Sequence, residues 1–111
     1  MKPDDLIRLK HILDAARETL SLSSGYKRVD LDTNRMLTLA LIKDIEIIGE
    51  AAVNISKETK YELDQIDWQR IIGMRNRLVH VYFKIDLNIL WNTIQYDIPE
   101  LINELEKLLE S

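Results

Sequence analysis

The sequence has no cysteine, and it has only two histidines, three glycines and two prolines in 111 residues. Without cysteine, disulfides, thiolate metal sites and cysteine nucleophiles are all excluded. Two histidines are too few for a zinc site when no cysteine is available as a ligand. Gly25, Gly49 and Gly73 lie too far apart to form a glycine-rich phosphate loop. We therefore expect a chemistry that uses neither a metal nor a cofactor.

Long apolar runs are also missing from the sequence. No run approaches the roughly 20 residues that span a bilayer, and no charged-then-apolar leader opens the chain. We therefore expect a cytoplasmic protein with no membrane partner. A hydrophobic content of 46% with 31% charged residues is typical of one globular domain, here residues 1–111. The net charge of −4 argues against a general nucleic-acid coat, so any site for a polyanion must be local.

Apolar residues recur at helical spacing along most of the chain, and no useful stretch alternates with the period of a β-strand. The first helix is predicted to begin at Pro3-Asp4 and to end in residues 21–25, which have a loop-forming composition. His11 lies on this helix and is expected at its surface or boundary, with no assigned role. Residues 56–65 are polar without a clear period and are interpreted mostly as a connection.

The second half of the chain predicts further helices. Asp67 is expected to cap a third helix over residues 68–79, and Ile85-Asp86 to open a fourth. Asp97 is expected to cap a last helix, with Pro99 in its first turn, where a proline is tolerated. The predicted fold class is therefore all-α, a bundle of four or five helices.

The second helix carries more apolar residues than one face can hold. Asp30 or Asp32 is expected to cap it, and its apolar content runs to Ile55. Such a helix must be buried on more than one side, either as the central helix of a bundle or as a core helix that also faces a partner chain. Gly49 costs a helix about 1 kcal/mol relative to alanine, which favours a close helix crossing there, with Ala52 one turn on. Thirteen of the twenty residues from 36 to 55 are apolar: Met36, Leu37, Leu39, Ala40, Leu41, Ile42, Ile45, Ile47, Ile48, Ala51, Ala52, Val53 and Ile55.

One stretch of the chain has a composition suited to chemistry. Carboxylate pairs such as Asp44-Glu46 point to different sides of a helix and are expected at the solvated surface. The stretch 75–83, in contrast, combines a histidine with two arginines, an amide and a phenol. No Asp or Glu occurs between Trp68 and Ile85, a region that holds four basic residues: Arg70, Arg75, Arg77 and Lys84.

This combination favours a phosphodiester as ligand. Arginine binds phosphate oxygens with a bidentate fork, and histidine is the side chain best suited to move a proton near neutral pH. His80 falls near the expected C-terminus of its helix, where the macrodipole favours the protonated imidazole. The competing interpretation is an arginine-rich helix end with a structural histidine.

Helical spacing leaves the arrangement of the stretch open. Asn76 and His80 lie within about 40° of each other on an ideal helix, whereas Arg75 and His80 are about 140° apart. For Arg75 and His80 to meet one phosphate, the helix must end near His80 or the arginine must reach around it. A third possibility is that a second copy of the chain completes the site.

The residues resemble a known family. Arg75-Asn76-Arg77-Leu78-Val79-His80 resembles the R-X4–6-H motif of HEPN domains, in which a polar residue commonly follows the arginine. The extension His80-Val81-Tyr82 resembles the R-X4-H-X-Y form of HepT-like toxins. Residues 47–52, 68–74 and 98–101 also resemble this family, so the resemblance covers nearly the whole chain.

The resemblance implies a homodimeric HEPN-like bundle in which the motifs of both chains face a shared cleft. It implies a metal-independent endoribonuclease, the toxin of a toxin–antitoxin pair, with RNA as substrate. Arg75 and His80 would be catalytic, and Asn76 and Arg77 would bind the phosphate. The cognate antitoxin would be a minimal nucleotidyltransferase that AMPylates Tyr82.

Two other functions compete with this one. A non-catalytic HEPN module that binds a nucleotide or a partner nucleotidyltransferase is the first, although such modules typically lack the Arg/His pair present here. A purely structural helical dimer is the second. It accounts for the apolar second helix but gives no reason for the acid-free basic stretch.

Overall fold

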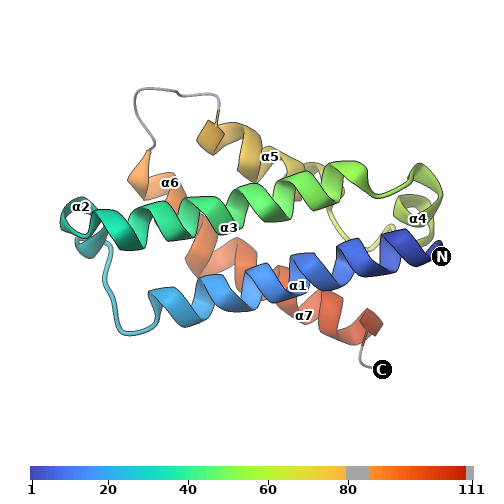
Figure 1. Cartoon of the computed structure of the whole chain (residues 1–111), viewed down its shortest axis with the longest axis horizontal. Coiled ribbons are helices and arrows are strands. Elements are labelled where there is room, and N and C mark those ends of the chain that lie inside the picture. The colour runs from blue at the N-terminus through green and yellow to red at the C-terminus, as the bar shows by residue number, and fades with distance from the viewer. Residues whose placement is uncertain (80–85, 110–111) are drawn as a thin grey trace.

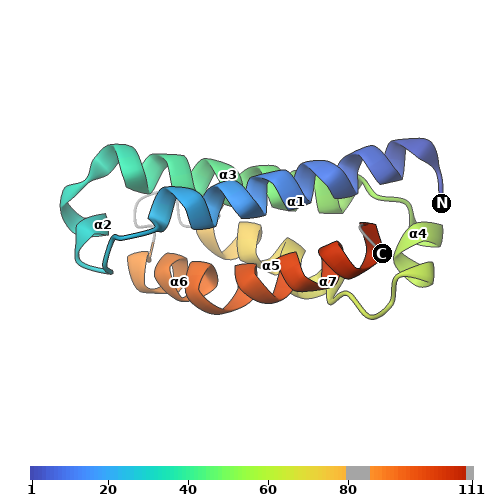
Figure 2. The ribbon, with the colours of Figure 1, turned by 90° about the horizontal axis from the view of Figure 1, so that it is seen from below.

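The computed structural model of the chain places its helices in two layers, which are seen edge-on in Figure 2. It describes residues 1–79 and 86–109. The long helices α1 (Pro3–Ser23) and α3 (Arg35–Asn54) run antiparallel in one layer (Figure 1). The helices α5 (Trp68–Val79) and α7 (Ile98–Leu109) lie in the other layer. No strand occurs in the described part of the chain, and the predicted all-α bundle is confirmed.

Local capping explains where two of the helices begin. The carboxylate of Asp67 accepts a hydrogen bond from the Arg70 amide at 3.0 Å, at the start of α5. Asp86 accepts from two backbone amides at the start of α6 (Leu87–Asn92). Each side chain satisfies amide donors that the first turn of a helix leaves unpaired. The predicted cap at Asp67 is confirmed, and the helix predicted to open at Ile85-Asp86 begins next to Asp86, with Ile85 outside the described residues.

The predicted start of the second helix is wrong. Asp30 and Asp32 belong to a separate short helix, α2 (Asp30–Thr33). The cap of α3 is Asn34, whose side-chain oxygen accepts a hydrogen bond from the Leu37 amide at 3.1 Å. Asparagine and aspartate are nearly equivalent as caps, so the sequence pattern did not distinguish these three positions.

The region 56–65, predicted mostly as a connection, contains the short helix α4 (Lys57–Glu62). Its cap is Ser56, whose hydroxyl accepts a hydrogen bond from the Thr59 amide. The buried carboxylate of Asp5, on α1, accepts hydrogen bonds from both the Ser56 and Thr59 hydroxyls at 2.6 Å. These hydrogen bonds lower the pKa of Asp5 to about 2. The acceptor that stabilises α4 therefore comes from a distant part of the chain.

The last helix also differs from its prediction. The segments α6, η1 (Thr93–Asp97) and α7 follow one another without a break, so Asp97 lies inside a continuous helical rod and does not cap it. The η1 segment is a π-helix, and the Ile98 amide bonds to the Thr93 carbonyl. Pro99 lacks an amide and its ring would clash with the carbonyl four residues earlier in a regular helix. A wider turn just before the proline relieves that clash.

The core forms where the two layers meet. α3 packs against both α1 and α5, which confirms that it is buried on more than one side. Four of its apolar residues nevertheless remain exposed: Met36, Leu39, Ile47 and Val53. The large apolar side chains that are essentially inaccessible come from both layers: Leu9, Ile12, Leu41, Ile45, Ile48, Met74, Leu90, Ile94, Ile98 and Leu105.

One carboxylate lies in an unexpected place. Asp44 was predicted at the solvated surface together with Glu46, but the Asp44 side chain is buried, with 3% of its residue surface exposed. Burial, together with the neighbouring Glu18, raises the pKa of Asp44 to about 7. Among the described residues, the Asp44 Oδ2 atom has no hydrogen-bond partner. The prediction for Asp44 failed because its side chain faces α1, a contact that is not local in sequence.

Candidate functional site

The structure describes three of the five predicted site residues. Arg75, Asn76 and Arg77 lie on α5. His80 and Tyr82 lie outside the described residues, so their position relative to Arg75 remains a prediction.

The aliphatic stem of Arg75 rests directly on Gly49, where α5 crosses α3. A β-carbon added at Gly49 would overlap the Arg75 β-carbon and would lie 2.8 Å from Cγ and 2.9 Å from Cδ. Such approaches are far inside van der Waals contact, so only glycine allows the arginine to lie there. The close crossing predicted at Gly49 is therefore present, and its neighbour is the arginine of the motif.

The guanidinium of Arg75 is held by an acidic residue of α3. Its Nη2 atom lies 2.5 Å from Oε1 of Glu50, the residue that follows Gly49. The Arg75 side chain is 30% exposed and that of Glu50 is 56% exposed, so the pair is open to solvent. Arginine has five N–H donors, and this pair engages one terminal nitrogen. The remaining donors can bind a phosphate without displacing Glu50.

Asn76 and Arg77 differ in their accessibility. Asn76 is half-buried, whereas Arg77 is exposed. The Arg77 Nε atom donates to the Gly73 carbonyl at 3.3 Å, which ties the base of this side chain to its own helix. None of the described carboxylates forms an ion pair with Arg77. Arg77 is therefore the most exposed of the three motif residues that the structure describes.

The absence of Asp and Glu between Trp68 and Ile85 does not leave the arginines of this region unpaired, because Arg70 and Arg75 both have acidic partners elsewhere in the chain. Arg70 pairs with Asp97 and, at 2.9 Å, with Glu100, which joins α5 to the helical rod that ends in α7. These partners raise the pKa of Arg70 above its already high value. Arg75 is paired as well, with Glu50. The region is free of acids in sequence but not in space, because α3 and α7 supply them.

An open groove adjoins Arg75. It has a volume of about 420 Å³ and lies between α1 and α3, with Arg75 contributed by α5. His11, which had no role assigned from its sequence context, lines this groove together with Arg75. No local sequence signal indicates this position, because it depends on the pairing of α1 with α3. The lining residues include three cations, two carboxylates and one histidine: Arg8, Lys43, Arg75, Glu46, Glu50 and His11.

Comparison with known proteins identifies the family. The family described as "Ribonuclease HepT-like" matches residues 12–108, which is most of the chain. This chain belongs to the ribonuclease HepT-like family. The match includes the whole of α5 and its motif, and it excludes only the two ends of this HepT-like chain.

Relatives of the HepT-like chain carry related names. It is 35% identical over 102 residues to "Putative RNase TTE0752" of Caldanaerobacter subterraneus subsp. tengcongensis, covering 92% of this chain and 91% of the relative. It is 35% identical to "Probable ribonuclease HepT" of Thermococcus cleftensis, covering 89% of this chain and 94% of the relative. No solved structure matches the chain.

A third relative is longer. "Gamma-glutamylcyclotransferase and putative RNase MJ0434" of Methanocaldococcus jannaschii is 34% identical over 110 residues, which span 99% of this chain but 50% of that protein. The HepT-like chain thus corresponds to half of a two-function protein in that organism. As for membranes, none of the helices in the described ranges is long and apolar enough to cross one.

The crossing at Gly49 generates a prediction for the stability of the HepT-like chain. Gly49→Ala should lower the free energy of unfolding by about 1–3 kcal/mol, because the added methyl group overlaps the Arg75 stem. Gly73→Ala is the matched control, since a β-carbon there meets no described atom within 4 Å. Gly73→Ala should raise stability by about 0.5–1 kcal/mol through helix propensity. Urea unfolding followed by circular dichroism measures both, and equal effects of the two substitutions would contradict the close crossing.

Proposed function

We propose that this chain is a metal-independent endoribonuclease, the toxin of a HEPN/minimal nucleotidyltransferase toxin–antitoxin system. The observation that carries the proposal is the position of Arg75. Its stem is fixed on Gly49, its guanidinium is held at one edge by Glu50, and it opens onto a groove. Membership of the ribonuclease HepT-like family supports RNA as the substrate. We take residues 1–111 as one domain that acts in the cytoplasm.

The proposed reaction is an internal transfer within RNA. The ribose 2′-oxygen attacks the adjacent phosphorus and the bond to the 5′-oxygen breaks, leaving a 2′,3′-cyclic phosphate and a 5′-hydroxyl. The 2′-hydroxyl loses a proton and the leaving oxygen gains one, and His80 carries out one of these transfers. Arg75 stabilises the charge that develops on the phosphate, with Asn76 and Arg77 as further phosphate ligands.

Glu50 has a defined part in this proposal. A free arginine side chain loses conformational entropy when it binds a phosphate, and an arginine that is already held loses less. Gly49 and Glu50 fix the Arg75 side chain before RNA arrives. Because Glu50 is exposed, water screens its charge and limits its repulsion of the phosphate.

The proposed activity is tested by incubating the purified protein with RNA in the presence and absence of EDTA. Cleavage should persist in the chelator and leave cyclic phosphate ends or their hydrolysis products. His80→Ala should lower the rate by roughly 10²–10⁴-fold. Arg75→Lys keeps the charge but loses the planar fork, so it should also impair cleavage. Loss of cleavage in EDTA, with recovery on adding magnesium, would contradict the proposal.

We propose in addition that the active form is a tight homodimer in which two motifs share one cleft. The exposed apolar residues Met36 and Leu39 at the start of α3 support this, since ideal helical spacing places them within about 60° of each other and neither lines the groove beside Arg75. The Met36 side chain is 83% exposed and is therefore open to contact with a second copy of the chain. Light scattering should therefore give twice the chain mass at micromolar concentration. A monomer under those conditions would rule out the composite site.

The proposed antitoxin is a minimal nucleotidyltransferase that acts on Tyr82. The phenol oxygen would attack the α-phosphorus of ATP, losing its proton, and pyrophosphate would leave. The attached adenylate would bring an anion next to Arg75 and would exclude RNA by bulk and by like charge. This inactivation requires the Tyr82 hydroxyl to be accessible at the cleft.

Tyr82→Phe should separate the two activities. The variant should keep its fold and much of its cleavage activity, because the hydroxyl has no part in the proposed chemistry. It should also resist inactivation by the partner nucleotidyltransferase with ATP. Intact-mass spectrometry should show the added mass of one adenylate on the wild-type chain only. Equal modification of both proteins would show that the antitoxin acts at another residue.

A further inference from the structure

The groove beside Arg75 is one end of a longer furrow between α1 and α3. A second hollow of about 230 Å³ continues it, and His11 and Ile47 line both hollows. The two ends differ in charge. Arg8, Lys43 and Arg75 line the first hollow together with Glu46 and Glu50, whereas Asp14, Glu18 and Asp44 line the second, without a cation.

We propose that the end next to Arg75 is a second phosphate-binding site, in which Lys43 and His11 hold the RNA backbone beside the scissile phosphate. This inference rests on the proposed ribonuclease function and deepens it, because it identifies where the substrate lies outside the motif. The ligand is a phosphodiester of single-stranded RNA at a nucleotide other than the one that is cleaved.

The cations of this end are available to a ligand. The Lys43 ammonium lies 4.0 Å from Glu46 and its side chain is 70% exposed, so the pair is loose. Arg8 is 3.4 Å from Asp5, whose carboxylate is already occupied by the Ser56 and Thr59 hydroxyls. His11 is exposed and has no hydrogen-bond or ion-pair partner among the described residues. Its imidazole can therefore donate an N–H to a phosphate oxygen.

Spacing along α3 separates this site from the motif. Glu50, which pairs with Arg75, lies seven residues after Lys43 on α3. Seven residues make about two helical turns, so the two side chains share one face of α3 and are about 10 Å apart along its axis. A phosphate bound at Lys43 is therefore distinct from the one bound at Arg75. Arg8 and His11 are three residues apart on α1 and face the same groove, so both helices contribute to the site.

The opposite end of the furrow limits the length of the bound RNA. Asp14 and Glu18 are exposed and repel a polyanion, and Asp44 lies beneath them. Bound RNA should therefore occupy the furrow from Arg75 to Lys43 and His11 and turn away from the acidic end. The furrow thus provides a short binding track that ends before the acidic hollow.

The test uses a fluorescent single-stranded oligonucleotide with 2′-O-methyl groups, which keeps the phosphates but cannot be cleaved. Its dissociation constant is measured by anisotropy at several salt concentrations with the full-length protein. Lys43→Ala and His11→Gln should each weaken binding by about threefold to tenfold, and Lys43→Ala should lower the salt slope by about 0.7. With cleavable RNA, the same variants should raise KM and leave kcat unchanged.

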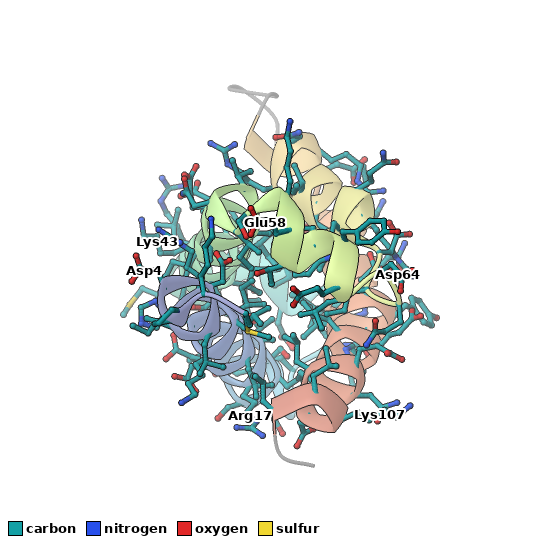
Figure 3. All side chains as sticks on the ribbon, turned by 90° about the vertical axis from the view of Figure 1, so that its right-hand side faces the viewer. Asp4, Arg17, Lys43, Glu58, Asp64 and Lys107 are labelled. Atoms are coloured by element: carbon teal, nitrogen blue, oxygen red, sulfur yellow. The ribbon has the colours of Figure 1, made fainter. Side chains whose placement is uncertain are left out.

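Lys107→Ala is a matched control for Lys43→Ala. Lys107 is also on a helix, pairs with a glutamate three residues away at 3.9 Å and has a side chain 66% exposed. Figure 3 shows the two lysines on different sides of the molecule. If Lys43→Ala and His11→Gln bind the oligonucleotide as tightly as Lys107→Ala does, the proposal of a second phosphate-binding site is wrong. If the wild type binds the oligonucleotide and both variants bind it more weakly, but no RNA is cleaved, the second phosphate site stands and the proposed ribonuclease activity fails. If the wild type binds no RNA, both proposals fail.

Discussion

The crossing of α3 and α5 at Gly49 is the constraint on which the candidate site depends. The absence of a side chain there lets α5 approach closely enough for the Arg75 stem to lie on the α3 backbone. The same approach places the Arg75 guanidinium against Glu50, one residue further along α3. α3 also supplies Leu41 and Ile45 to the core and packs against both α1 and α5, so the site is built on a well-supported helix.

Most of the fold could be predicted because its determinants are local. Apolar periodicity defines the long helices, and the Asp67 and Asp86 caps act within three residues of their own position. The errors have non-local causes. α4 depends on a carboxylate of α1, Asp5, which lies 51 residues before its partner Ser56. Asp97 looks like a cap beside Pro99, but its side chain is engaged by Arg70 of another helix.

The candidate site shows the same division between local and non-local information. The motif around Arg75 could be read from the sequence because its residues are adjacent. The place of His11 in the groove, and the burial of Asp44, arise from the packing of α1 on α3. No spacing within one segment carries that information. A sequence also cannot show which carboxylates approach an acid-free stretch, and in this chain α3 and α7 both supply them.

Those carboxylates distinguish two arginines that look equivalent in the sequence. Arg70 uses both terminal nitrogens, one on Asp97 and one on Glu100, so it joins α5 to the helical rod that ends in α7. Arg75 uses one terminal nitrogen on Glu50, and the rest of its fork has no partner in the described part of the chain. With both terminal nitrogens bonded to carboxylates, Arg70 cannot present them as a pair to a phosphate, whereas Arg75 is oriented by Glu50 and keeps its other terminal nitrogen available. The pairing pattern therefore assigns Arg70 to structure and leaves Arg75 able to bind phosphate.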